Sequence, residues 1–350
     1  MCGMAGIFDT QSDTKPDEAL IRRMTDAIIH RGPDEAGYHV GPGIALGHRR
    51  LSIIDIATGQ QPLFNADRSL AIVYNGEVYN FAELREELRD LGFRFHTRSD
   101  TEVILHAWEA WNSACVDRLR GMFAFAILDE TRQQLFLARD RLGIKPLYYS
   151  HNSERLLFAS TTQALLAADP SMDTCIDAYA MHNLFSLHAV VPAPRTILKG
   201  IRKLRPAHYM VFDDDGSFTE KPYWKLVAKR PDSAMDENEW INAIHDSLRS
   251  AVERRLRIAD VPVGVLLSGG IDSSLLVALL SEAGVKGLKT FSVGFEDQPE
   301  EKGNEFEYSD AVALRYATEH HRFLVPNDQV LPRLPEAFRH MTEPMFAQDA

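Results

Sequence analysis

Long hydrophobic runs separated by short polar segments predict strands that are buried on both faces. Four of these runs lie at residues 69–74, 122–128, 135–138 and 155–159. A polar turn joins the second run to the third, which predicts a hairpin. Asn75 and Gly76 follow the first run directly, and this pair predicts a turn at the end of that strand.

Two amphipathic segments between these runs predict helices. In residues 81–91 the hydrophobic positions recur three and four residues apart, and Asn80 and Glu83 are expected to form a reciprocal capping pair. A second helix is expected to begin at Ser99, and Ser99 and Glu102 are expected to form the same kind of reciprocal capping pair. Strands with helices outside them predict a layered α+β domain.

A change of pattern separates this region from a second domain. Residues 211–235 are rich in turn-forming and charged residues, so we expect a linker there between domains at residues 2–210 and 236–350. An amphipathic helix, a strand, a second helix and a second strand are then expected at residues 239–257, 261–267, 273–283 and 288–295. Strand, helix and strand in this order predict a parallel α/β sheet. This domain is short for a nucleotide-binding fold, so we expect the sequence to be a piece of a longer protein.

Composition and charge exclude several classes of protein. The chain has 350 residues, enough for two domains, and its 45% hydrophobic and 25% charged residues are ordinary for a globular protein. Its formal net charge of −12 argues against binding nucleic acid through a broad basic surface. No hydrophobic run is long enough to span a bilayer, and the first residues lack a signal-peptide pattern. We therefore expect a cytoplasmic protein that has neither nucleic acid nor a membrane as a partner.

The cysteines and histidines do not form a metal-binding pattern. Cys2, Cys115 and Cys175 are too few and too widely spaced for a disulfide framework or a metal site, which fits a reducing compartment. Cys115 and Cys175 are expected to be small buried hydrophobic residues. His48 and the pair at residues 320–321 are expected to be structural, because neither has metal-ligand spacing.

The most specific motif of the second domain is Ser-Gly-Gly-Ile-Asp-Ser at residues 268–273, between an expected strand and an expected helix. Glycines let backbone N–H groups close on an anion, and a helix N-terminus adds a favourable field. No lysine stands where a Walker loop requires one. The alternative is a plain strand-to-helix turn with Asp272 or Ser273 as the cap. The strand and the helix on its two sides favour a phosphate-binding loop.

Cys2 stands directly after the first methionine, and its small size permits removal of that methionine. Cys2 would then carry both a thiol, with an ordinary pKa near ~8.5, and a free α-amine, with an ordinary pKa near ~8. Such an amine can act as general base for the thiol beside it. An inert terminal cysteine is the alternative, but it leaves the motifs that accompany Cys2 unexplained.

Those motifs are RGPD, GHRRLSIID, YNGE, SDTE and RDRLGIKPLYY, at residues 31–34, 47–55, 74–77, 99–102 and 139–149. Together with Cys2 they resemble the glutaminase domain of class II amidotransferases, which are N-terminal-nucleophile enzymes with an αββα sandwich. The Ser-Gly-Gly loop resembles the pyrophosphate loop of ATP pyrophosphatases. The whole chain thus resembles the glutamine-hydrolysing asparagine synthetase family, with an α+β glutaminase domain followed by an apparently truncated α/β ATP-pyrophosphatase-type domain.

The resemblance implies roles for residues of the first domain. Cys2 would attack the side-chain amide of glutamine, while the side chain of Asn75 and the N–H of Gly76 would form the oxyanion hole. The other expected glutamine-binding positions are Arg50 for the α-carboxylate, Glu77 and Asp100 for the α-ammonium, and the backbone of Leu51 and Ile54. Taken singly, these residues could equally be a turn, a helix start or a surface charge.

The resemblance also implies ATP as a cofactor, together with Mg²⁺ to neutralise the departing pyrophosphate. Asp272 is the candidate residue near Mg²⁺, and the sequence defines no further metal ligands. The expected ATP-binding residues are Leu267 and Val293 beside the adenine, and Ser268, Gly269, Gly270, Asp272 and Ser273 at the phosphates.

The implied reaction transfers ammonia from glutamine to a carboxylate acceptor that ATP activates as an acyl-adenylate, with release of AMP and pyrophosphate. Aspartate is the acceptor in asparagine synthetases. Residues 188–198, 305–310 and 343–345 are instead similar to the branch that amidates N-acetylglutaminylglutamine, and Thr342 stands where asparagine synthetases carry Asp. The acceptor therefore stays open between aspartate and this dipeptide, and a homodimer is the candidate assembly.

Two other classes of protein are disfavoured. A phosphoribosyl amidotransferase would share the glutaminase domain but needs a different pyrophosphate site from the Ser-Gly-Gly loop. A non-catalytic relative would be expected to lack the nucleophile, and Cys2 is present.

Overall fold

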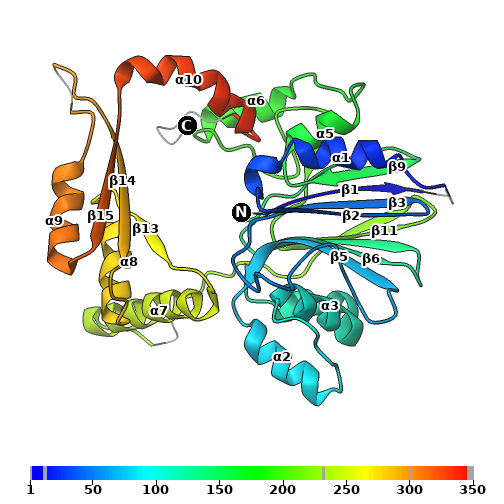
Figure 1. Ribbon diagram of the computed structural model, residues 1–350, viewed down its shortest axis with the longest axis horizontal. Coiled ribbons are helices and arrows are strands. Elements are labelled where there is room, and N and C mark those ends of the chain that lie inside the picture. The colour runs from blue at the N-terminus through cyan, green and yellow to red at the C-terminus, as the bar shows by residue number, and fades with distance from the viewer. Residues whose placement is uncertain (1, 11–13, 231–232, 300–301, 345–350) are drawn as a thin grey trace. The chain divides into compact units, whose positions relative to one another are not determined.

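The computed structural model describes residues 2–10, 14–230, 233–299 and 302–344, and the chain divides into two compact units. Unit 1 comprises Met1–Val227 and His340–Ala350, and unit 2 comprises Ala228–Arg339 (Figure 1). None of the helices in the described ranges is long and apolar enough to cross a membrane.

Unit 1 is built on two six-stranded antiparallel sheets. In sheet order, the first contains β10 (Arg202–Lys203), β8 (Tyr148–His151), β9 (Arg155–Ala159), β1 (Gly3–Asp9), β3 (Ile44–Arg50) and β2 (Glu35–Gly41). The second contains β12 (Phe218–Pro222), β11 (His208–Asp213), β7 (Gln134–Arg139), β6 (Gly121–Asp129), β5 (Leu70–Val78) and β4 (Leu63–Phe64).

The two sheets face each other, and helices cover their outer faces (Figure 1). Alternate residues of facing strands, such as Met4, Leu46 and Val73, form the core between the sheets. The outer helices are α1 (Glu18–Asp26) and α5 (Thr162–Ala168) on the first sheet, and α2 (Phe81–Asp90) and α3 (Asp100–Trp111) on the second. The short helices η1 (Ile29–Arg31), η2 (Asn112–Ala114) and α4 (Cys115–Arg118) lie in the connections. This is the expected αββα sandwich.

Unit 2 contains the expected parallel α/β arrangement. Its three-stranded sheet has the order β13 (Gly264–Leu266), β14 (Lys289–Phe295) and β15 (Glu319–Val325), with parallel pairing throughout. The helices are α7 (Glu237–Ile258), α8 (Ile271–Glu282), α9 (Phe306–Tyr316) and α10 (Asn327–His340). Val252 of α7 and Val277 of α8 pack with Val265 in the core of this unit.

Asn75 and Gly76 do not form the expected turn. Strand β5 continues through them to Val78, because Asn75 pairs with Ala124 and Gly76 with Phe123 of β6. A Cβ atom on Gly76 would lie 2.3 Å from the carbonyl oxygen of Met122. Glycine is therefore required here by the close approach of β6 and not by a turn.

The expected linker begins too early in the chain. Strands β11 and β12 occupy part of residues 211–235 and pair with each other, while β11 also pairs with β7. The polar residues after Asp213 form the turn of this hairpin, with Gly216 at φ +84°. A hairpin turn and a linker have the same polar composition, so the pattern alone does not separate them.

The two expected helix caps differ. Ser99 accepts a hydrogen bond from the N–H of Thr101 (3.1 Å) and caps α3 as predicted. The reciprocal bond from Glu102 is not formed, because Glu102 accepts from the N–H groups of His96 and Thr97 instead. Asn80 precedes α2, but its side chain makes no capping bond. Instead it donates to the carbonyl of Arg118 (3.0 Å) and accepts from the N–H of Arg120 (2.8 Å). Asn80 thus fastens α2 to the start of β6.

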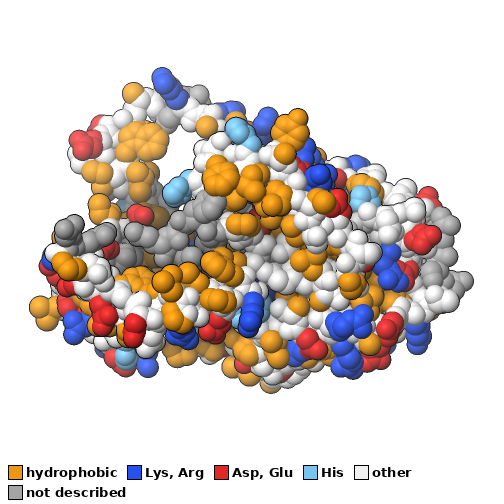
Figure 2. Space-filling model, turned by 90° about the horizontal axis from the view of Figure 1, so that it is seen from above, with side chains coloured by type: hydrophobic (Ala, Val, Ile, Leu, Met, Phe, Trp, Pro, Cys, Tyr) orange, Lys and Arg blue, Asp and Glu red, His pale blue; other side chains and the backbone are white. Residues whose placement is uncertain are grey.

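Helix α6 (Ala178–Ser186) lies at the surface of unit 1 and contributes to a small separate core. Its Tyr179 and Phe185 are exposed, and Figure 2 shows hydrophobic side chains interspersed with charged ones on the face seen there. Cys175, which precedes α6, is exposed, so the prediction that it is buried was wrong. Cys115 is fully buried as expected.

The far end of the chain returns to unit 1. Lys203 Nζ donates to Glu343 Oε2 (2.6 Å) and to the carbonyl of Val191 (2.5 Å). Thr162 Oγ1 donates to the carbonyl of Thr342 (2.8 Å). Residues 341–344 are therefore part of this unit, while Met345 lies outside the described residues.

A buried charge cluster on α3 predicts a pH-dependent stability. Burial by itself lowers the pKa of His106, but hydrogen bonds to Glu102 and Glu109 raise it to about 9 overall. This pKa lies above the ordinary value, so the contribution of His106 is complete below pH ~6.5 and is lost as the pH rises through about 9. Between pH 6.5 and 9.5 we expect the free energy of unfolding to fall by about 1–3 kcal/mol more in the wild type than in His106→Gln. Denaturant unfolding of both proteins across this range measures the difference, and parallel curves would contradict it.

Candidate active site

Cys2 lies one residue before β1 and lines a cavity of about 190 Å³. Its Sγ accepts a hydrogen bond from the N–H of Leu51 (3.4 Å) and donates to the carbonyl of the same residue (3.6 Å). Gly3 pairs with Arg49 across β1 and β3, so continuation of the register puts Cys2 opposite Arg50. The thiol is thus held at the end of a strand pair whose remaining residues are anchored in the core.

The environment of Cys2 keeps its thiol protonated near neutral pH. Burial raises the pKa of Cys2, and the Leu51 N–H with the charges of Arg50 and Lys145 lowers it by less. Any nucleophilic role of this thiol therefore requires a base close to it. The expected base is the α-amine that removal of Met1 would create on Cys2, but Met1 lies outside the described residues.

The same cavity collects every residue expected to bind glutamine. Its lining includes Cys2, Arg50, Leu51, Ile54, Asn75, Gly76, Glu77 and Asp100. These residues come from the position before β1, from β3 and the loop after it, from β5 and from α3, which are distant along the chain. Long-range pairing of the strands, and not proximity in sequence, brings them together.

Asn75 provides an unused pair of polar atoms at this cavity. Its side chain is 1% exposed, and neither Nδ2 nor Oδ1 has a hydrogen-bond partner in the structure. A buried polar group without a partner is costly and is rare in native proteins. A carbonyl oxygen bound in the cavity would satisfy the Nδ2 donor.

The N–H of Gly76 lies on the edge of β5 that faces away from β6. Strand β4 pairs only with Ile72 and Ala71, so the later part of β5 has no neighbouring strand on that side. The N–H groups of Tyr74 and Val78 donate there to the side chains of Gln61 (2.6 Å) and Asp100 (2.9 Å). Because strand geometry repeats every two residues, the Gly76 N–H lies on this edge as well.

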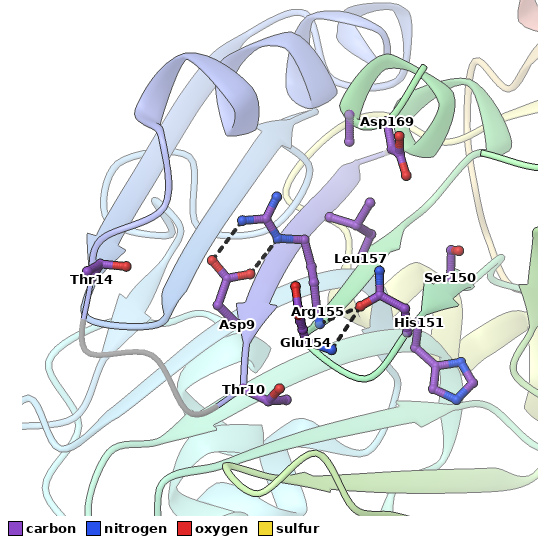
Figure 3. A pocket seen from close by; sticks show the side chains of 11 residues that line it. Asp9, Thr10, Thr14, Ser150, His151, Glu154, Arg155, Leu157 and Asp169 are labelled. Carbon is purple, nitrogen blue, oxygen red and sulfur yellow. Dashed lines mark hydrogen bonds and ion pairs between the residues drawn. The ribbon is translucent and has the colours of Figure 1, made fainter. Parts of the chain in front are cut away.

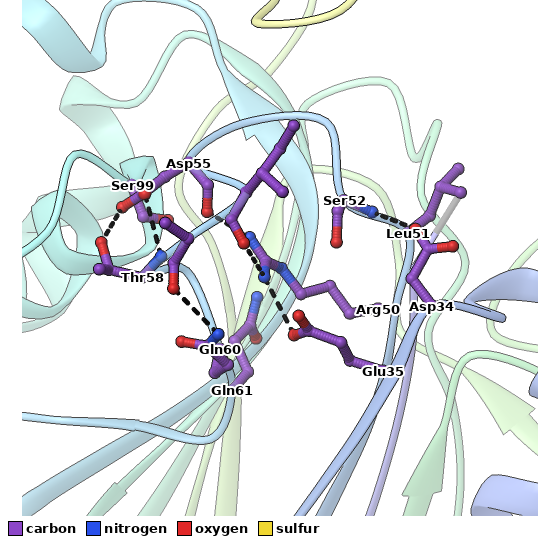
Figure 4. A network of polar contacts seen from close by, with 12 residues as sticks. Asp34, Glu35, Arg50, Leu51, Ser52, Asp55, Thr58, Gln60, Gln61 and Ser99 are labelled. Carbon is purple, nitrogen blue, oxygen red and sulfur yellow. Dashed lines mark hydrogen bonds and ion pairs between the residues drawn. The ribbon is translucent and has the colours of Figure 1, made fainter.

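Arg50 lines the cavity, but its guanidinium is engaged by the loop that follows β3 (Figure 4). Nη1 donates to Glu35 Oε2 (3.0 Å) and to the carbonyl of Ile56 (3.2 Å), and Nη2 donates to the carbonyls of Ile54 (3.2 Å) and Asp55 (2.5 Å). An α-carboxylate would have to replace some of these contacts. In this structure Arg50 holds the loop that closes one side of the cavity.

Asp100 is fully buried at the first position of α3. Its Oδ2 accepts hydrogen bonds from the hydroxyl of Tyr74 (2.7 Å) and the N–H of Val78 (2.9 Å). Burial raises the pKa of Asp100, and these two donors oppose the shift. Glu77 is half-buried on β5, the strand that carries Tyr74 and Val78. Burial lowers the pKa of Lys145, and the charge of Glu77 opposes this shift. The cavity therefore presents two carboxylates within one small volume.

Two residues of this site received no role from the sequence. Arg31 Nε donates to the carbonyl of Cys2 (3.1 Å), and its Nη2 is buried without a hydrogen-bond partner. Lys145 is 3% exposed and lines the cavity with Cys2. Arg31 belongs to the RGPD motif and Lys145 to the RDRLGIKPLYY motif. Membership in a motif was the only signal that pointed to them.

A second and larger cavity, of about 740 Å³, lies at the other end of β1 (Figure 3). It is lined by Asp9, at the opposite end of the strand from Cys2, and by Arg155 and Asn152. Arg155 donates to both carboxylate oxygens of Asp9 (2.5 and 2.8 Å), and Asn152 Oδ1 accepts from the N–H of Arg155 (2.8 Å). These groups satisfy one another, and none of the predicted residues lies there.

In unit 2, the Ser-Gly-Gly loop connects β13 to the N-terminus of α8 as expected. Ser268 Oγ lies 3.1 Å from Ser273 Oγ and accepts from the N–H of Gly270 (3.2 Å). Gly270 is the N-cap of α8 and supplies no side chain to its first N–H groups. An anion at this helix N-terminus would find free donors and a favourable dipole.

Leu267 and Val293 differ in their suitability to contact adenine. Val293 on β14 is 64% exposed, whereas the side chain of Leu267 is 1% exposed in the core of unit 2. The backbone of Leu267 is engaged as well, because its N–H donates to the carbonyl of Phe291 (2.7 Å) and its carbonyl accepts from Ser292 Oγ. In this structure Val293, and not Leu267, is accessible to a base, which corrects the expectation that both residues flank adenine. Asp272 is an exposed carboxylate in the first turn of α8. Within the described ranges no group of three or more His, Cys, Asp or Glu residues could hold a metal ion.

Gly269 has a backbone and a packing environment that exclude a side chain. Its φ is +90°, and a Cβ there would lie 2.5 Å from Cβ of Tyr308 on α9. We expect Gly269→Ala to displace the loop and weaken Mg-ATP binding at least about tenfold, because backbone donors at a phosphate require close approach. Gly284 is the matched control, since its φ is +84° but nothing lies within 4 Å of its Cβ position. Calorimetric titration should show weakened binding for Gly269→Ala alone, and equal affinities in the two variants would contradict the prediction.

Comparisons with known proteins define the class. Residues 1–224 match the glutamine amidotransferase domain family, and residues 243–350 match the asparagine synthase family. The chain therefore belongs to the glutamine amidotransferase family. Within that class, the chain also carries the asparagine synthase match, and its curated relatives are named glutamine-hydrolysing asparagine synthetases.

Individual relatives agree with this assignment. Asparagine synthetase (glutamine-hydrolysing) 1 of Bacillus subtilis is 37% identical over 99% of this chain and 53% of its own length. Asparagine synthetase B of Escherichia coli is 31% identical over 97% of this chain and 57% of its own length. The chain thus spans about half the length of the curated relatives it matches. Among solved structures, a glutamine phosphoribosylpyrophosphate amidotransferase of B. subtilis matches 93% of this chain and 91% of that chain, with 16% identity and a TM-score of 0.48, a likeness too low to support any inference.

Proposed function

We propose that unit 1 hydrolyses glutamine at Cys2 and that unit 2 contributes to an ATP site where a carboxylate acceptor is activated for amide formation. The observation that carries this proposal is the single cavity in which the Cys2 thiol meets the unpartnered side chain of Asn75. Cleavage of an amide by a thiol needs a nucleophile and donors for the developing oxyanion, and both are present at one end of the sandwich.

The proposed glutaminase step begins with transfer of the thiol proton of Cys2 to its own α-amine. The sulfur forms a bond to the side-chain carbonyl carbon of glutamine, and Nδ2 of Asn75 with the N–H of Gly76 stabilises the oxyanion. Collapse breaks the C–N bond, and the amine returns the proton to the leaving group, which departs as ammonia. Water then hydrolyses the thioester to glutamate. Glu77 and Asp100 would bind the α-ammonium of glutamine, and Arg50 its α-carboxylate after exchanging loop contacts.

In the proposed synthetic step, Ser268, Gly269, Gly270 and Ser273 bind the phosphates of ATP at the N-terminus of α8. Asp272 is one carboxylate beside this loop, which fits Mg²⁺ that is held mainly by nucleotide phosphates and water. When bound, Mg²⁺ would neutralise charge on the departing pyrophosphate. The proposed acceptor is aspartate, in keeping with the names of the relatives, and the acetylated dipeptide is the alternative suggested by Thr342 and its neighbours.

Two measurements test the proposal. Mass spectrometry of the purified protein should show loss of Met1, because a retained methionine would block the amine of Cys2. Incubation of the full-length protein with glutamine, ATP and Mg²⁺ should yield glutamate, AMP and one amidated acceptor. Aspartate and N-acetylglutaminylglutamine are offered in separate reactions, and amidation of neither would overturn the synthetic part of the proposal.

A further inference from the structure

His48 lies in the layer between the two sheets of unit 1, at the end that carries Cys2. It is 1% exposed on β3, where it pairs with Met4 of β1, two residues from Cys2. Residues two apart on a strand share a face, so the side chain of His48 points into the same layer as that of Leu46. A histidine in an otherwise apolar layer requires a polar partner.

That partner belongs to the opposite sheet. Nε2 of His48 lies 2.9 Å from the carbonyl oxygen of Tyr74 on β5. A carbonyl oxygen only accepts hydrogen bonds, so Nε2 carries the proton. Burial lowers the pKa of His48 to about 4, which leaves the ring neutral at physiological pH. The neutral ring of His48, on the first sheet, therefore donates an N–H hydrogen bond to the backbone of the second sheet.

The Tyr74 carbonyl is part of the peptide group that leads into Asn75. The N–H of Tyr74 donates to Oε1 of Gln61 (2.6 Å), so side chains hold both backbone polar groups of this residue. None of the strands in the described residues does so, because β4 pairs with β5 only at Ile72 and Ala71. The orientation of the Tyr74–Asn75 peptide plane fixes where the Asn75 side chain points and, one residue later, where the Gly76 N–H points.

We propose that His48 is a positioning residue for glutamine hydrolysis: its bond to the Tyr74 carbonyl joins the strand pair that carries Cys2 to the strand that carries the oxyanion donors. The inference rests on the proposed glutaminase function and adds a residue to it. We do not assign His48 as the base for Cys2, because the hydrogen bonds of Cys2 Sγ join it to the backbone of Leu51, whereas His48 contacts the carbonyl of Tyr74. It sets the alignment of the thiol with Asn75 and Gly76.

The test compares three variants of the full chain, assayed well below their unfolding temperatures. His48→Leu removes the donor, and His48→Gln restores an N–H donor of similar reach. Leu46→Ala is the control, because Leu46 is fully buried in the same layer on the same strand and makes no polar contact there. We expect His48→Leu to lower kcat for glutamate release about 10- to 100-fold with KM changed less than about threefold, a fraction of the loss known for removing an oxyanion donor. His48→Gln and Leu46→Ala should stay within about fivefold of the wild-type kcat.

Alkylation of Cys2 by iodoacetamide separates positioning from activation of the thiol. This displacement forms no oxyanion, so its rate in His48→Leu should stay within about threefold of the wild type. An equal fall in alkylation and hydrolysis would overturn the inference, since His48 would then act on Cys2 itself. An unchanged kcat in His48→Leu would overturn it too. If His48→Leu does not fold, His48→Asn replaces it in the same comparison. A wild-type chain that releases no glutamate overturns the proposed function, and this inference with it.

Discussion

Replacement of Cys2 by alanine is expected to lower glutamine hydrolysis by at least about 10⁴-fold. Cys2 carries the only thiol in the described lining of the cavity that also carries the unpartnered Asn75, and loss of a covalent nucleophile removes the main reaction path. Glutamate release measured with the purified protein checks this result.

The matched control is Cys175→Ala, which removes an exposed thiol elsewhere on unit 1 and should leave the rate unchanged. In the full-length protein, Cys2→Ala should still use free ammonia for ATP-dependent amide formation. If both the glutamine-dependent and the ammonia-dependent reactions disappeared, two separate sites would no longer explain the enzyme.

Asn75→Ala is expected to lower kcat for glutamine hydrolysis about 10²- to 10³-fold while KM changes by only a few-fold. The donor acts on charge that develops in the transition state, so its loss of about 2.7–4 kcal/mol falls on kcat. Because neither polar atom of the Asn75 side chain has a partner, the substitution breaks no existing hydrogen bond of that side chain. Steady-state kinetics of glutamate release separate the two parameters.

Asn65→Ala is the control for loss of a buried asparagine. Asn65 is 8% exposed, and its side chain bonds to Ser69, to Glu109 and to the N–H of Leu70. Its replacement should lower the free energy of unfolding without changing kcat. A reversed outcome, with Asn65→Ala inactive and Asn75→Ala active, would remove Asn75 from the proposed oxyanion hole.

Much of the architecture follows from local patterns in the sequence. The runs at residues 122–128 and 135–138 become β6 and β7, and the cap at Ser99 starts α3, because hydrophobic burial and capping act over a few residues. Asn75 and Gly76 show the limit of this reasoning. Their turn propensity is overridden by pairing with β6, which is distant in the sequence.

The residues of the candidate site could be predicted from the sequence, but their hydrogen-bond partners and orientations could not. Motifs named Arg50 without showing that its guanidinium holds the loop around Asp55. They also left His48 as a structural residue, because its partner is a backbone carbonyl on another strand and a backbone carbonyl has no identity in a sequence motif. Contacts between sheets arise from tertiary packing, which periodicity does not encode.

The return of residues 341–344 to unit 1 means that the folded amidotransferase unit is not one continuous piece of chain. A shortened chain ending at Val227 would keep Lys203, which is 8% exposed, and lose the carboxylate of Glu343 that pairs with it. A buried ammonium without its counter-charge is strongly destabilising. Anyone who isolates this unit by cutting the gene at the end of the amidotransferase match would thus create a charge defect that the intact chain does not have, and replacing Lys203 with methionine would be the corresponding repair.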